Sequence, residues 1–256
     1  MKEKTLILAK ASPVVSKKYE SLVCVGGITE KEEWRRIYPV PWACFWKGKD
    51  TCFKKKSWIE YELKNNLPSD HRKESRKIIF ESIHPLKEES YKQIREILQK
   101  KLTTIEELEK KSHKEVSMGV IKPELIDFIE EDANNEKFKK RKSQKTLDMT
   151  DAVKIDIAEK KYSYRFKCGH PNCRGHKMMC EDWELGELYR HCEDYRKKGK
   201  YKDSKEVFDK IKKRMFFEML NKKELYFIVG THFIHPTYMI IGVVYPKKTD
   251  KWQILN

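Results

Sequence analysis

Five side chains of the types that bind transition metals lie within one short stretch of the chain. Cys168, Cys173, His176 and Cys180 are spaced C-x4-C-x2-H-x3-C, and His170 adds a second imidazole. Thiolate and neutral imidazole are preferred ligands of zinc, and a structural site needs four of them. The spacing therefore predicts a structural Zn²⁺ site at Cys168, Cys173, His176 and Cys180, with His170 as the alternative fourth ligand. A reduced, cysteine-rich turn without metal is the competing interpretation.

The elements on either side of this stretch would position it. Residues 152–166 alternate apolar and polar side chains, which predicts a strand that leads into Cys168. Asp182 can cap a helix in which Cys192 falls on the apolar face, so we expect Cys192 in the core rather than at the metal. Further helix starts are predicted at Thr104, where Thr104-x-x-Glu107 forms a capping box, and at Asp203.

The first part of the chain has the pattern of a small β-rich module. Short apolar runs at residues 5–9 and 21–25, and alternating apolar and polar side chains at residues 57–63, are separated by Gly- and Pro-containing turns, which predicts a barrel or curled sheet. The pattern does not distinguish an OB-like from an SH3-like barrel. The predicted class is α+β, and the predicted organisation is a β-rich module, a helical connector, a basic flexible linker or loop, and an α/β module with the metal site, at residues 1–85, 86–131, 132–150 and 151–256.

The charge balance points to a polyanionic partner. The chain has 56 Lys and Arg against 40 Asp and Glu, a net charge of +16. Abundant Lys and Glu is typical of thermophiles, but that habit does not explain the imbalance. Nucleic acid is the first expectation. No secretory signal is visible, and residues 228–244 contain His and Pro, which favours buried strands over a membrane span. We therefore expect a cytoplasmic protein with free thiols and no membrane partner.

Aromatic and basic residues alternate through residues 34–58, as single-stranded nucleic acid binding requires for stacking and charge neutralisation. Such aromatics can equally form the core of a small β domain. Basic clusters elsewhere extend the candidate surface. The candidate nucleic-acid-binding residues are Arg35, Arg36, Trp42, Phe45, Trp46, Lys54, Lys55, Lys56, Arg72, Lys139, Lys140, Arg141, Lys212, Lys213 and Arg214.

Three groups of residues together resemble an uncharacterised prokaryotic family with no known activity. They are residues 10–41, notably W-R-R-I-Y-P at 34–39; the Cys/His loop followed by D-W-E-L-G-E-L-Y at 182–189; and F-I-V-G-T-H at 227–232 with His235-Pro236. The resemblance spans most of the chain and implies no catalytic residue.

The sequence favours a nucleic-acid-binding protein, predominantly for single-stranded DNA or RNA, with structural zinc. One alternative is a Mg²⁺- or Mn²⁺-dependent nuclease in genome maintenance or defence, for which Asp182, Glu184, His232 and His235 are the candidate catalytic residues. Another alternative is a subunit of a ribonucleoprotein or defence complex with protein partners. The absence of GxxxxGK[ST] and GxGxxG patterns argues against an ATPase or a dinucleotide enzyme.

Overall fold

The chain folds into the expected mixture of helices and strands, with strands predominating. The computed structural model describes residues 1–13, 22–45, 48–111, 113–133, 159–222, 224–232 and 237–246. Most of the predicted basic linker, residues 134–150, lies outside them. None of the helices in the described part is long and apolar enough to cross a membrane.

The N-terminal part is a six-stranded sheet curled into a half-barrel, in the strand order β5-β3-β2-β1-β4-β6. The alternation predicted for residues 57–63 is confirmed, because every second residue of β4 is buried. Its inward side chains pack with those of β1–β3 around Ile7, Val25 and Ile37. The elements are β1 (Lys2–Lys10), β2 (Leu22–Thr29), β3 (Trp34–Pro41), the 3-10 helix η1 (Trp42–Phe45), β4 (Ser57–Leu63), β5 (Ser75–Arg76) and β6 (Ile78–Glu88).

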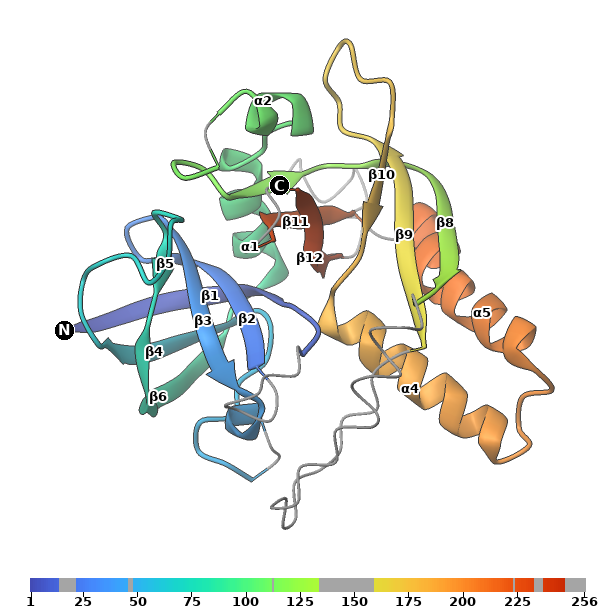
Figure 1. Ribbon diagram of the computed structural model, residues 1–256, viewed down its shortest axis with the longest axis horizontal. Coiled ribbons are helices and arrows are strands. Elements are labelled where there is room, and N and C mark those ends of the chain that lie inside the picture. The colour runs from blue at the N-terminus through green and yellow to red at the C-terminus, as the bar shows by residue number, and fades with distance from the viewer. Residues whose placement is uncertain are drawn as a thin grey trace, which may run out of the picture.

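Two short helices connect this sheet to the rest of the chain, which forms two antiparallel three-stranded sheets, β10-β9-β8 and β12-β11-β7. Helices α4 and α5 lie beside the sheet β10-β9-β8 (Figure 1). The elements are α1 (Tyr91–Lys100), α2 (Ile105–Glu109), β7 (Met118–Ile121), β8 (Glu124–Asp132), β9 (Lys160–Lys167), β10 (His176–Met179), α4 (Trp183–Lys197), α5 (Ser204–Lys212), the π-helix η2 (Lys213–Phe217), α6 (Glu218–Lys222), β11 (Tyr226–Thr231) and β12 (Tyr238–Val244).

The two parts share a hydrophobic core. Side chains on the outer face of β1 and β2, such as Leu8 and Ile28, pack against Met118, Tyr226 and Ile228 of the sheet β12-β11-β7. The approach is close: a Cβ atom on Gly26 would lie 2.5 Å from the Cε of Met118. In Figure 1, β11 and β12 accordingly lie between the half-barrel and the sheet β10-β9-β8. The outer face of β1–β2 is therefore interior to the molecule.

Three helices begin at residues whose side chains cap the first backbone N–H groups. The predicted capping box begins α2: the Thr104 side chain accepts from the backbone N–H of Glu107, and the Glu107 side chain accepts from that of Thr104. Asp182 caps α4 and Asp203 caps α5, as predicted. Cys192 is 4% exposed in the core, also as predicted. Helix α2 has only five residues, so its position depends on what it packs against.

Candidate metal centre

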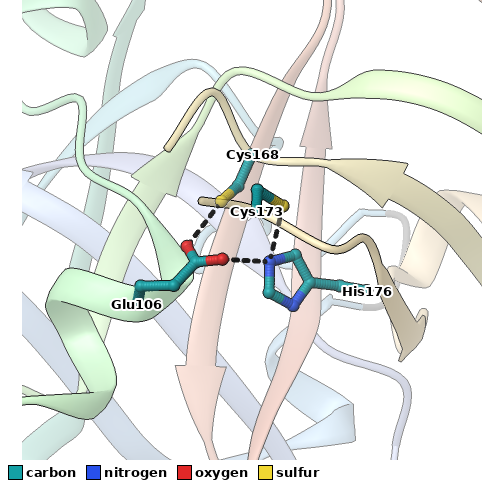
Figure 2. Close-up of side chains that lie close together, drawn as sticks. All are labelled: Glu106, Cys168, Cys173 and His176. Carbon is teal, nitrogen blue, oxygen red and sulfur yellow. Dashed lines mark hydrogen bonds and ion pairs between the residues drawn. The ribbon is translucent and has the colours of Figure 1, made fainter. Parts of the chain in front are cut away.

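Four metal-binding side chains meet beside the β9–β10 hairpin. Glu106 comes from α2, Cys168 directly follows β9, Cys173 lies in the turn, and His176 begins β10. One ligand atom from each of the four lies within 4.8 Å of all the others. Figure 2 shows the helix and the hairpin presenting these side chains toward one another. The arrangement can therefore hold one metal ion.

The distances suit a tetrahedral ion of zinc size. The Cys168 Sγ donates to Glu106 Oε2 at 2.8 Å, and Glu106 Oε1 lies 3.2 Å from His176 Nε2. The Cys173 Sγ lies 3.3 Å from the same nitrogen. Ligand atoms around tetrahedral zinc are separated by roughly 3.3–3.8 Å, given bonds of about 2.0–2.3 Å. Small side-chain movements would complete the coordination shell.

The hairpin backbone is shaped for this convergence. Gly169 and Gly175 have φ angles of +82° and +93°, which L side chains rarely adopt. The backbone N–H of Cys173 donates to the carbonyl of His170 at 3.0 Å and closes the turn. The N–H of Gly175 donates to the Cys173 Sγ at 3.4 Å, a contact that helps to fix the position of this sulfur.

The electrostatics of Cys168 and Glu106 are linked. Burial and the adjacent Glu106 carboxylate raise the pKa of the Cys168 thiol to about 11. Partial burial alone would raise the pKa of Glu106, but the hydrogen bond from Cys168 and the nearby His176 outweigh it and lower that pKa. Without a metal the proton therefore stays on sulfur. A bound cation would displace that proton and gain two anionic ligands.

The structure brings together three of the four ligands predicted from the spacing and places the other two candidates elsewhere. Cys180 lies in the core, where its backbone N–H donates to the Tyr162 carbonyl at 2.8 Å. His170 accepts from the backbone N–H of Asn172 at 3.2 Å and is not part of the group. Glu106 was missed because it lies 62 residues before Cys168 in a different element. No spacing rule signals a ligand so distant.

Asp182, a catalytic candidate, is a buried structural hub. Its Oδ2 accepts from Lys55 Nζ and from the backbone N–H of Val243, both at 2.7 Å. Its Oδ1 accepts from the N–H groups of Glu184 and Leu185 at the start of α4. Burial alone would lower the pKa of Lys55, but Asp182 and Glu184 outweigh it and hold that pKa above its usual value. Asp182 therefore has no oxygen facing solvent.

The remaining catalytic candidates do not form a site with Asp182. Glu184 lies 3.1 Å from Lys55 Nζ and accepts from the Tyr245 hydroxyl. His232 is half-buried, and its backbone N–H donates to the Thr237 carbonyl. His235 lies outside the described residues. Asp182 and Glu184 both contact the Lys55 ammonium, so a lysine already occupies the position between these two carboxylates.

Trp42 and Phe45 of segment 34–58 are half-buried and pack against other aromatic side chains. Trp42 stacks on Trp183 with ring centroids 4.2 Å apart, and Phe45 contacts Phe53 and Trp183 at 4.9 and 5.2 Å. Lys10 places its ammonium group 4.8 Å from the centroids of both Phe45 and Trp183. Burial and the neighbouring Lys55 lower the pKa of Lys10 to about 8. Trp46 lies outside the described residues.

Four of the basic candidates are buried, which corrects their assignment to a phosphate-binding surface. Arg36 is 1% exposed and donates to the carbonyl and hydroxyl of Ser117. Arg35 and Arg72 form ion pairs with Glu3 and Asp70, each at 2.6 Å. The fourth is Lys55. These cations satisfy acids and carbonyls of the same chain, so these four side chains are not available to a partner.

The other basic candidates vary in exposure. Lys54 is exposed and lies 3.6 Å from Glu88, while Lys56 contacts Tyr91. Lys212 pairs with Asp127 at 2.8 Å and Arg214 with Glu218 at 2.6 Å, whereas Lys213 is exposed. Lys139, Lys140 and Arg141 lie outside the described residues.

Two family models cover the chain. A model described as Domain of unknown function (DUF8758) matches residues 1–103, and one described as Domain of unknown function (DUF8757) matches residues 99–256. The chain therefore belongs to the DUF8757 family, which confirms the resemblance to an uncharacterised family. The two matches meet at the end of α1. No curated protein and no solved structure matched the chain.

The identity of the fourth ligand can be tested by zinc content. We expect purified protein to hold about one zinc ion per chain. Cys173→Ser and Glu106→Ala should each lower that content sharply, because each removes a member of the four-residue group. Cys180→Ala and His170→Ala are the matched controls and should keep the zinc. Loss of zinc in Cys180→Ala, with retention in Glu106→Ala, would restore the sequence-based ligand set.

The buried ion pair predicts a large effect on stability. Asp182→Ala should lower the free energy of unfolding by about 3–5 kcal/mol, because it leaves the buried Lys55 ammonium unpaired. Urea denaturation monitored by circular dichroism would measure it. The control Asp209→Ala, at an exposed position of α5, should change stability by less than about 0.5 kcal/mol. An Asp182→Ala variant as stable as the control would contradict this role.

Lys10 predicts a pH-dependent contribution to stability. Its pKa is about 8 in the folded protein, against an ordinary value of 10.5 for an unfolded lysine, so between these values the unfolded state binds more protons. Stability relative to Lys10→Met should therefore rise with pH between 8 and 10, by at most about 1.4 kcal/mol per pH unit. Thermal or urea unfolding of both proteins across this range would show it. Parallel pH profiles would rule it out.

Proposed function

We propose that this protein binds nucleic acid and uses a structural zinc ion, held by Glu106, Cys168, Cys173 and His176, to fix part of the binding surface. The observation that carries the proposal is the exposed basic side chains on the same two elements as the ligands. Lys167 ends β9 and Arg174 lies in the turn before β10, and Lys110 and Lys111 follow α2. Within the described part of the chain, none of these four has a carboxylate within ion-pair distance, so they remain available to phosphate.

The donor set supports zinc in a structural role. Two thiolates, one imidazole and one carboxylate are all ligands that zinc accepts, and together they fill a tetrahedral shell without a water position. Such an ion would join the hairpin to α2. It would also neutralise the negative charge of the Glu106 carboxylate and of two thiols that lose their protons on binding, while the surrounding basic side chains stay free for a polyanion.

The half-barrel favours an OB-like over an SH3-like assignment. Strand β1 pairs with both β2 and β4, β3 pairs in parallel with β5, and the chain continues directly into β6, which pairs with β4. This strand order supports an OB-like barrel, a fold in which strands 2 and 3 commonly contact oligonucleotides. Here Met118 and Ile241 pack against the outer face at Gly26 of β2. The proposed surface therefore lies at the hairpin and α2 instead.

A preference for single strands stays a prediction. It rested on exposed aromatic side chains for stacking, and Trp42 and Phe45 pack against Trp183. Trp46, outside the described residues, is the remaining aromatic candidate. Comparing the affinities for single- and double-stranded probes tests this preference.

The geometry favours binding over hydrolysis. A metal-dependent nuclease needs oxygen ligands for Mg²⁺ or Mn²⁺, and both oxygens of Asp182 are engaged by Lys55 and backbone N–H groups. In the described part of the chain, the group of potential metal ligands contains two thiols, which suits zinc. A ribonucleoprotein subunit would use the same basic surface, and pull-down with and without nuclease treatment would identify it.

The proposal predicts salt-dependent binding. Fluorescence anisotropy with labelled single- and double-stranded DNA and RNA should show affinity that falls steeply with salt, with a log–log slope that becomes shallower by about 1 for each phosphate contact removed. Lys167→Gln with Arg174→Gln should weaken binding to every probe. Lys197→Gln with Lys205→Gln, at exposed positions of α4 and α5, removes equal charge and is the control. Affinity no tighter than about micromolar for every probe at low salt would end the proposal.

A further inference from the structure

A hollow lined mainly by lysines lies between the end of α1 and α2. It has a volume of about 520 Å³, and its charged and polar lining consists of Lys100, Lys101, Thr103, Glu107, Lys110 and Lys111. The two family matches overlap at residues 99–103, so the hollow lies where the two domains join. Helix α2 also carries the metal ligand Glu106. None of these four lysines was singled out by the sequence patterns.

The acids near the hollow do not cancel its positive charge. Glu107 is held by the capping box, where its Oε2 accepts from the Thr103 hydroxyl at 2.7 Å and from the Thr104 N–H at 3.1 Å. Lys100 pairs with Glu32 at 3.0 Å. Among the described residues, no carboxylate lies within ion-pair distance of Lys101, Lys110 or Lys111.

The carbonyl ends of α1 and α2 balance only part of the positive charge of the lysines that line the hollow. Lys101 and Lys110 are the C-cap residues of α1 and α2, where backbone carbonyls favour cations. A helix end contributes roughly half an elementary charge, and α2 is short. Among the residues that line the hollow, four lysines face one glutamate, which leaves a surplus of positive charge in the lining. The surplus faces an open hollow, which is the arrangement that attracts an anion.

We propose that this hollow binds phosphate, with the phosphodiester backbone of a nucleic acid as its ligand. Lysine binds phosphate as a point charge and needs no fixed donor geometry, which matches lysine side chains around an open hollow. The inference rests on the proposed function and adds a location to it: the junction of the two domains, beside the zinc-binding helix. A free nucleotide has the same chemistry and is distinguished by experiment.

The test compares two triple variants that remove equal charge. Lys101→Gln, Lys110→Gln and Lys111→Gln should weaken oligonucleotide binding at least about tenfold at 0.1 M salt and make the log–log salt slope shallower by about 2–3. Lys197→Gln, Lys202→Gln and Lys205→Gln change exposed lysines of α4, α5 and the loop between them, far from α2 in Figure 1. The control triple should bind nearly as well as the unaltered protein. Equal melting temperatures would show that both variants fold.

Lysine acetylation footprinting of the unaltered protein gives a second measurement. An oligonucleotide should protect Lys101, Lys110 and Lys111, but not Lys197, Lys202 and Lys205. Equal protection by ATP or inorganic phosphate at low millimolar concentration would assign the hollow to free phosphate compounds and remove the backbone as its ligand. The protein could bind oligonucleotides while these lysines stay unprotected and the triple variant keeps its affinity. In that case the hollow is not the binding site, although the proposed function stands. If no oligonucleotide binds, the function fails, and protection by ATP or phosphate decides the hollow separately.

Discussion

The ion pair between Lys55 and Asp182 holds the two parts of the chain in one arrangement. A carboxylate at 1% exposure is costly unless all of its lone pairs are used. Here one oxygen accepts from Lys55 and from Val243 of β12, and the other caps α4. The Asp182 side chain thereby joins three segments: the residues just before β4, the first turn of α4, and β12. The sheets, helices and hairpin that carry the candidate metal ligands are all placed relative to this point.

The shared core covers the outer face of β1 and β2, so this face of the half-barrel cannot contact a ligand. Leu8, Ile28 and Met118 exclude water between the half-barrel and the sheet β12-β11-β7. Arg36 lies at the edge of this contact and donates to Ser117, so it pins the two parts together rather than facing a ligand. Arg36, a predicted phosphate-binding residue, thus stabilises the contact between the two parts of the chain. The surface charge left for a partner lies on other elements.

Local signals predicted local structure well. The capping box at Thr104 and Glu107, and the caps at Asp182 and Asp203, depend on neighbours within three residues, so the sequence alone determines them. Three of the four clustered metal-type residues share one hairpin and were also found. Long-range partners could not be predicted. Glu106 joins Cys168 across 62 residues, and Trp42 stacks on the distant Trp183, so a residue predicted to stack on bases is half-buried against another aromatic side chain.

Helix α2 connects the two proposed sites physically. Five residues form too few hydrogen bonds to hold a helix in water, so tertiary contacts must fix it. Ile105 and Leu108 are buried on one side, and Glu106 reaches the hairpin thiol and imidazole on another. Lys110 and Lys111 follow directly and line the hollow with the end of α1. Zinc at Glu106 would therefore restrain the segment that carries these lysines, and a polyanion bound across the junction would restrain the same segment. Each ligand would reduce the conformational freedom that the other must remove, which is the physical basis for positive coupling between zinc and phosphate binding.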